Sequence, residues 1–226
     1  MIIGMLIFPD LTQLDFAGPH EVLTRLPQSE VKIIAKSLQP VRAQSGVITI
    51  PDTMMAAAPQ VDLVFVPGGP GVGAQMEDAE TLEFLRRQAQ RAKYVTSVCT
   101  GALVLGAAGL LKGYRATTHW SSLDLLPIFG ATPVADRVVI DRNRITGGGV
   151  TAGIDFGLTV AGEVFGARVA KSIQLGLEYN PAPPFNSGHP STAEADIVED
   201  ERRKRAPQHA ARLEQARRAA RLYCGA

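Results

Sequence analysis

The chain has 226 residues, 46% of them hydrophobic, so it can bury a full core within one domain. Its formal net charge of +1 gives no reason to expect nucleic acid or a membrane as partner, and two cysteines are too few for a disulfide framework. No apolar run approaches the ~18–20 residues that span a bilayer, and the N-terminus lacks a signal peptide's basic start and cleavage site. We therefore expect a soluble, cytoplasmic protein.

Strands and helices are predicted to alternate along most of the chain. The predicted strands are residues 2–8, 31–35, two short segments within 41–50, 61–66, 94–98, 116–118, 138–140 and 144–146. The predicted helices are residues 18–26, 78–93, 100–109, 121–129, 151–165 and a further one to about 177. This alternation predicts an α/β fold with a largely parallel sheet.

The character of the chain changes at Asn180. We expect residues 1–179 to form an α/β catalytic domain, and residues 180–226 to form an extended segment and a polar, mostly helical tail, interrupted at Pro207. The tail is rich in Arg and Glu. One interpretation is a solvated helix laced with ion pairs, and another is an arm that packs on the domain or on a second subunit. Nucleic-acid binding is a third and weaker alternative.

A β-branched run ends abruptly at Cys99, and a helix of small residues follows it. This pattern predicts a strand, a sharp turn and a helix, with the thiol at the turn. The N-terminus of that helix offers free N–H groups and a partial positive charge, which favour a thiolate nucleophile. The alternative is a buried structural cysteine. Cys224, near the C-terminus, is read as incidental.

Two further segments are expected at the same edge of the sheet. The loop 67–71 is glycine-rich, and N–H groups of Gly69 and Thr100 are predicted to form an oxyanion hole, although the loop alone is only a turn signal. Asp15 lies among apolar residues and is a candidate acid/base with a raised pKa, or else the N-cap of the helix near Gly18. His119 is a candidate base for Cys99, or a buried, hydrogen-bonded histidine.

No residues have metal-ligand spacing and no dinucleotide-binding motif is present, so we expect neither metal nor cofactor.

Seven segments together resemble the PfpI-like superfamily, which is related to class I glutamine amidotransferase domains, and within it the isocyanide hydratases. They are residues 8–9, 13–19, 67–69, 94–101, 116–120, 146–156 and 177–186. The resemblance implies a flavodoxin-like three-layer sandwich, a homodimer, and hydration of isocyanides with water to N-formamides through a covalent thioimidate.

The same resemblance implies roles for individual residues. Cys99 would be the nucleophile and Asp15 its acid/base partner. Thr100 occupies the position where peptidase-like members carry histidine, which argues against a peptidase and leaves a hydroxyl to bond substrate or sulfur. Gly148 and Val150 precede the helix that packs near the nucleophile and would control its shift during turnover. Since an isocyanide carries little charge, we expect an apolar pocket, with Leu14, Phe16 and Ile154 close by as well as Val150.

Two rival functions remain open at this stage. One is another cysteine chemistry on the same fold, such as a glyoxalase, deglycase or amidase activity. The other is a non-enzymatic domain that binds a ligand or senses oxidation, because exposed cysteines of low pKa are readily oxidised.

Overall fold

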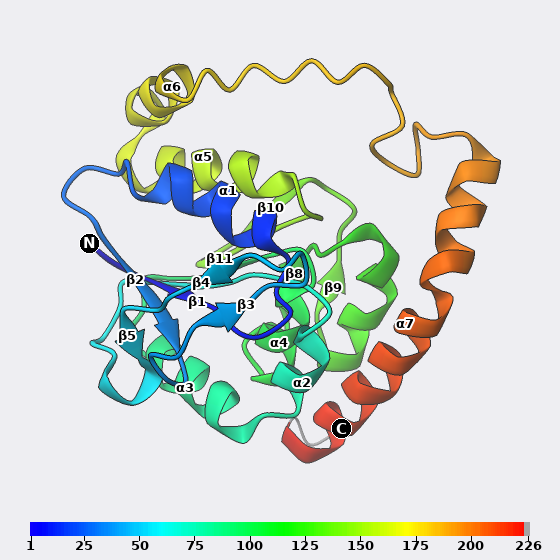
Figure 1. Cartoon of the computed structure of the whole chain (residues 1–226), viewed down its shortest axis with the longest axis horizontal. Coiled ribbons are helices and arrows are strands. Elements are labelled where there is room, and N and C mark those ends of the chain that lie inside the picture. The colour runs from blue at the N-terminus through cyan, green and yellow to red at the C-terminus, as the bar shows by residue number, and fades with distance from the viewer. Residues whose placement is uncertain (224–226) are drawn as a thin grey trace.

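The computed structural model describes residues 1–223, and Cys224 lies outside them. Its centre is a seven-stranded sheet in the order β10-β11-β7-β6-β1-β2-β5 (Figure 1). The strands of this sheet are β1 (Ile2–Leu6), β2 (Glu30–Ala35), β5 (Thr53–Met54), β6 (Leu63–Val66), β7 (Tyr94–Val98), β10 (Val138–Asp141) and β11 (Arg144–Gly147). All neighbours pair in parallel except β10 with β11. Two short pairs stand apart, β3 (Val41–Arg42) with β4 (Ile48–Thr49) and β8 (Arg115–Ala116) with β9 (Thr132–Pro133).

Helices cover both faces of this sheet. The helices of the chain are α1 (Gln13–Leu23), α2 (Val72–Met76), α3 (Ala79–Ala89), α4 (Gly101–Ala107), α5 (Ala152–Phe165), α6 (Ala167–Gly176) and α7 (Ala195–Tyr223), with 3-10 turns η1 (Met55–Ala57) and η2 (Trp120–Phe129). Helix α6 packs on α5, and α7 packs on η2, α2 and α4. Helices α1 and α5 pack together on one face, and α3 and α4 lie on the other (Figure 1). The predicted α/β sandwich with a mostly parallel sheet is confirmed.

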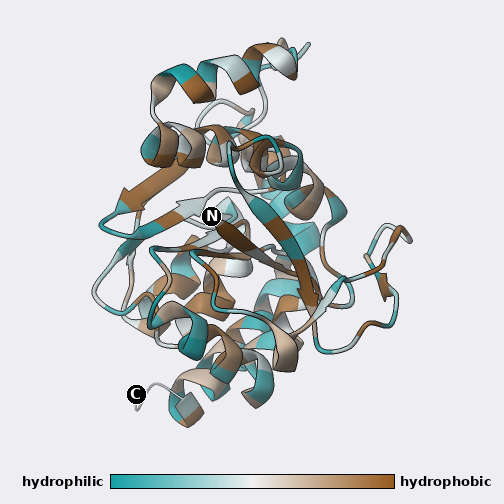
Figure 2. Ribbon diagram, turned by 90° about the vertical axis from the view of Figure 1, so that its left-hand side faces the viewer, coloured by the Kyte–Doolittle hydropathy of each residue, from teal (hydrophilic) through white to brown (hydrophobic). Residues whose placement is uncertain are grey.

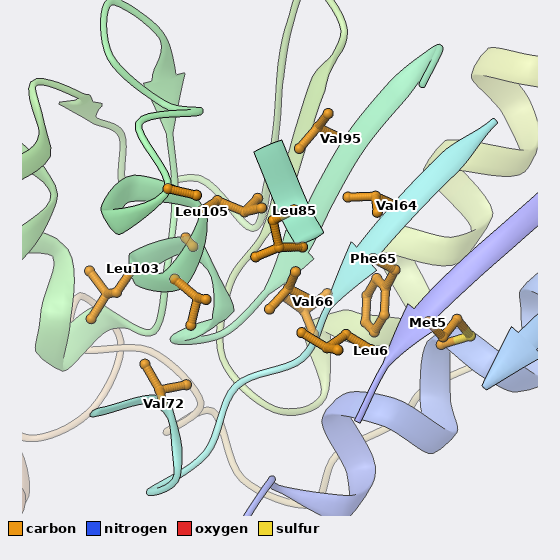
Figure 3. Packing of buried hydrophobic residues seen from close by; sticks show 14 of the residues in the cluster. Met5, Leu6, Val64, Phe65, Val66, Val72, Leu85, Val95, Leu103 and Leu105 are labelled. Atoms are coloured by element: carbon orange, nitrogen blue, oxygen red, sulfur yellow. The ribbon is translucent and has the colours of Figure 1, made fainter. Parts of the chain in front are cut away.

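The core lies on both sides of the sheet, as a parallel sheet requires. Met5 and Leu6 of β1 meet Phe65 and Val66 of β6, and Leu103 of α4 belongs to the same cluster (Figure 3). Hydrophobic stretches recur along the central strands, whereas the helices carry both hydrophobic and hydrophilic residues (Figure 2). The strands are therefore buried from two directions, and their carboxyl ends form the edge where loops gather.

Glycines bring α5 unusually close to α1. A Cβ on Gly153 would lie 2.7 Å from Cδ of Pro19, and one on Gly157 would lie 2.8 Å from Cβ of Val22. Side chains at these positions would push the helices apart. The close approach fixes α1, which carries Asp15, relative to α5.

Two local predictions are wrong. Helix α1 begins at Gln13, so Asp15 lies in its first turn and is not the N-cap of a later helix. Helix α7 runs without interruption through Pro207, because only one backbone hydrogen bond depends on that position and the helix is held by packing against η2, α2 and α4. In the described part of the chain, no helix is both long enough and apolar enough to cross a membrane.

Candidate active site

Cys99 occupies the predicted turn between β7 and α4, with φ of +51°. Its N–H donates to the carbonyls of Gly147 (3.0 Å) and Gly148 (2.9 Å), which holds this left-handed conformation in place. A non-glycine residue there is strained, and such strain persists only where the surroundings enforce it. The next helix can start at once because Gly101 lacks a Cβ, which would lie 2.2 Å from the carbonyl oxygen of Val66. The local sequence therefore builds a nucleophile elbow.

Asp15 is fully buried beside this thiol. Its Oδ2 accepts the N–H of Gly68 at 3.0 Å. Its Oδ1 is bonded to no nitrogen or oxygen donor among residues 1–223, which leaves that oxygen for the thiol of Cys99. Burial raises the pKa of Asp15 from 3.8 to about 7, more than the hydrogen bonds with Cys99 and Gly68 lower it. A carboxyl with a pKa near neutrality can both accept and return a proton.

The contact between Asp15 and the nucleophile turn requires a glycine at position 68. A Cβ on Gly68 would lie 2.6 Å from the backbone nitrogen of Thr100 and 2.7 Å from Oδ2 of Asp15. Neither atom can retreat, since both are buried and bonded to their neighbours. The second glycine, Gly69, has φ of +136°, which disfavours any side chain. The glycine loop is therefore a spacer between acid/base and nucleophile.

Two backbone N–H groups face the sulfur of Cys99. The N–H of Gly69 donates to Oγ1 of Thr100 at 3.0 Å and is directed to that hydroxyl. The backbone N–H groups of Thr100 and Val150 hydrogen-bond the sulfur of Cys99 instead. Val150 presents its N–H from a strained backbone with φ of +33°. The predicted oxyanion hole, in which the N–H groups of Gly69 and Thr100 face the group that Cys99 attacks, stays a prediction.

The surroundings of Cys99 raise the pKa of its thiol. Burial and the negative charge of Asp15 raise its pKa from 9.0 to about 12, outweighing the two backbone N–H groups. The helix N-terminus does not outweigh this burial, because it lowers the pKa of an exposed thiol and this side chain is only 4% exposed.

His119 lines the same cavity but is held by Ser121. Its Nδ1 lies 2.8 Å from Oγ of Ser121 and accepts the Ser121 N–H at 3.2 Å, an arrangement that caps η2. Burial, together with the charges of Arg205 and Arg212, lowers the pKa of His119 from 6.5 to about 4. A neutral, capping imidazole favours the structural interpretation over that of a base for Cys99.

The cavity above Cys99 has a volume of about 210 Å³. Its lining is Thr12, Gln44, Gly69, Pro70, Cys99, Thr100, His119, Ser121, Val150, Arg205, Gln208 and Arg212. The predicted apolar pocket is therefore wrong, and of the four apolar residues expected only Val150 lines it. Gly148 lines a neighbouring cavity of about 390 Å³, which shares His119 and Val150 with the first.

Sequence reasoning missed the residues that α7 contributes. Arg205, Gln208 and Arg212 come from the tail that had been interpreted as a solvated helix or an arm. One signal was present in the sequence: at helical spacing, Arg212 falls on the same face as Ala216 and Ala219, which are buried. A charge within an apolar stripe indicates a buried cation, and the structure locates it at the nucleophile.

A deeply buried cysteine on a strained turn, paired with a carboxyl, defines a cysteine-nucleophile α/β protein. The chain belongs to the DJ-1/PfpI family, whose model matches residues 1–163. It is 55% identical over 218 residues to the isonitrile hydratase of Pseudomonas putida, covering 96% of each chain.

Other relatives show how widely this domain is used. A crystal structure of a THiJ/PfpI family protein from Pseudomonas syringae superposes with a TM-score of 0.93 at 46% identity, covering 95% of this chain and 90% of that one. The helix-turn-helix transcriptional regulator GbdR of Pseudomonas aeruginosa is 33% identical over 179 residues, which are 76% of this chain and 48% of the regulator. Drosophila melanogaster DJ-1beta superposes with a TM-score of 0.72 at 26% identity, covering 78% of this chain and 97% of that one.

Proposed function

We propose that this protein hydrates isocyanides to N-formamides without a cofactor. The observation that carries the proposal is the buried pair of Cys99 and Asp15, in which one carboxyl of pKa about 7 exchanges a proton with the nucleophile. Similarity to an isonitrile hydratase across 96% of both chains supports the same reaction.

The first half of the reaction adds the S–H group to the terminal carbon of R–N≡C. Asp15 accepts the proton of Cys99 as a sulfur lone pair forms the S–C bond. The N–H groups of Thr100 and Val150 stabilise the charge on sulfur at that moment. The protonated Asp15 then gives its proton to the same carbon, which yields the thioimidate R–N=CH–S–Cys99. The carboxylate is thereby restored.

The second half hydrolyses this adduct. Asp15 takes one proton from water as the water oxygen bonds to the thioimidate carbon, and it passes that proton to the nitrogen as the C=N bond becomes single. Asp15 then takes the proton of the new hydroxyl as the C=O bond forms and the C–S bond breaks, and it returns this proton to the departing sulfur. The products are the N-formamide and the Cys99 thiol. One carboxyl serves both halves because its pKa lies near neutrality.

The test is steady-state formamide production from an alkyl or aryl isocyanide by wild type and by Cys99→Ala. Loss of all turnover in Cys99→Ala is expected, and appreciable residual turnover would overturn the covalent mechanism. Methylglyoxal is assayed in parallel. Faster consumption of methylglyoxal than of any isocyanide would assign the site to glyoxalase chemistry, and a protein that turns over neither but is readily oxidised at Cys99 would be a sensor.

We further propose a cytoplasmic homodimer in which residues 1–179 form the catalytic domain and residues 180–226 an extension packed on it. Large apolar side chains on and just before the extended segment support a second subunit, since Leu175 is 82% and Phe185 79% exposed. Light scattering of Phe185→Ser after gel filtration tests the dimer, which we expect this variant to weaken.

A further inference from the structure

Arg212 is a buried cation with poor partners. Arg212 is only 7% exposed and lies on the face of α7 that packs against the domain. Its Nη1 donates to Oγ of Ser122 at 3.3 Å, and its Nη2 donates to the carbonyl of Gly69 at 3.4 Å. Both bonds are long and both acceptors are neutral. A guanidinium withdrawn from water in this way requires negative charge nearby.

The acids around α7 do not supply that charge. On the helix itself, Glu201 pairs with Lys204 and Arg205. On the elements packed against α7, Asp124 pairs with His209 at 2.9 Å and Glu77 pairs with Arg218 at 2.6 Å. None of the ion pairs found within residues 1–223 includes Arg212.

Among residues 1–223, the groups at this cavity that can carry a negative charge are Cys99, which lines it, and Asp15, which lies beside Cys99. Arg212 and Cys99 line one cavity, with Arg205 as a second cation and His119 neutral. Ionised Cys99 raises the pKa of Arg212, although burial lowers it more strongly. Asp15 and Cys99 titrate as a pair, so one negative charge is shared between them once the pair has lost its first proton.

We propose that Arg212 offsets the negative charge that moves from Asp15 onto the sulfur of Cys99 when Cys99 loses its proton, so that α7 is a part of the active site. The helix lies beyond the family domain, which ends at residue 163. Arg212 acts on Cys99 through its charge and its place in the cavity wall, as a positioning residue. This inference rests on the proposed function only for turnover, because proton loss from Cys99 can be followed without any isocyanide.

The experiment compares Arg212→Met, which removes the charge, with Arg212→Lys, which keeps it. The matched control is Arg217→Met on the same helix, because Arg217 is exposed and pairs with Glu214. Alkylation of Cys99 by iodoacetamide, a neutral reagent, is followed against pH by mass spectrometry of the Cys99 peptide. Circular dichroism and thermal unfolding establish that each variant is folded.

In Arg212→Met we expect alkylation of Cys99 at neutral and mildly alkaline pH to be about tenfold slower than in wild type, which corresponds to a shift of the profile by about one pH unit. Arg212→Lys should recover most of that loss, and Arg217→Met should match wild type. A folded Arg212→Met variant with an unchanged profile overturns the proposal. Equal impairment of the Lys and Met variants also overturns it, because the role would then depend on shape.

A second arm separates charge on the enzyme from charge on the substrate. Turnover of isocyanoacetate and of its neutral methyl ester is measured for wild type and Arg212→Met. Comparable losses of kcat/KM for both substrates, alongside the shifted alkylation profile, support the proposal. A loss confined to isocyanoacetate, with alkylation unchanged, overturns it and assigns Arg212 to binding of an anionic substrate group. If neither substrate is turned over by wild type, the proposed function fails while the alkylation profile still decides the role of Arg212.

Discussion

Replacing Asp15 by Asn should abolish activity and, above neutral pH, stabilise the fold. The carboxyl is fully buried, and burial raises its pKa from 3.8 to about 7. Between these pH values the folded protein holds a proton that the unfolded chain has released. The free energy of unfolding of wild type therefore falls as pH rises from about 4 to about 7 and stays low above that. Asparagine cannot titrate, so the variant escapes this loss.

The size of the effect follows from the same two values. The separation between 3.8 and about 7 is worth about 4 kcal/mol at 1.36 kcal/mol per pH unit. The stability of Asp15→Asn relative to wild type should therefore rise by about 4 kcal/mol between pH 4 and pH 8. Any constant cost of fitting the amide against Gly68 and Cys99 cancels in this comparison.

The assay is urea unfolding of both proteins at several pH values, followed by the fluorescence of Trp120. Turnover of an isocyanide is measured on the same samples, and Asp15→Asn should lose at least about a hundredfold in kcat/KM because no base remains. A stability difference that is flat with pH would refute the reasoning, since it would mean that the carboxyl has the same pKa in folded and unfolded chains.

Three further outcomes are expected. The kcat/KM of wild type should rise with pH to half its maximum near pH 7, because Asp15 must be ionised to accept the thiol proton, and a pH–rate profile checks this. Gly68→Ala should lose most turnover and about 1–3 kcal/mol of stability in chemical denaturation, because its Cβ would lie 2.6 Å from the Thr100 nitrogen, whereas Gly176→Ala, whose Cβ meets nothing within 4 Å, should behave as wild type. Gly162→Ala in α5 should stabilise by about 0.5–1 kcal/mol in the same measurement, since its Cβ would meet only an ordinary contact at 3.8 Å. A destabilised Gly162→Ala variant would contradict that estimate of the space around the helix.

The features that sequence predicted well are local ones. The strand, turn and helix around Cys99 follow from a β-branched run that meets a run of small residues, a pattern of local preferences, although the strand is completed by pairing with β6 and β11. The alternation of strands and helices predicted the three layers for the same reason. The pairing of Asp15 with Cys99 was anticipated from apolar surroundings and family resemblance, although its helix begins earlier than predicted.

The features that prediction from the sequence missed depend on segments far apart in the chain. Proline at position 207 predicted a break, but the packing of α7 on the domain outweighs one lost hydrogen bond. The raised pKa of the Cys99 thiol could not be read from the sequence, because it depends on how completely the fold removes water.

By itself, then, the sequence determined an α/β sandwich and a cysteine at a strand-to-helix turn, since these rest on short-range patterns of side-chain size and polarity. Only the tertiary structure decided the environment of that cysteine. It placed Asp15 against a glycine 53 positions away and carried Arg212 to the Gly69 carbonyl across 143 positions. Burial and charge at a site are sums over everything that the fold brings near, and no local pattern contains that sum.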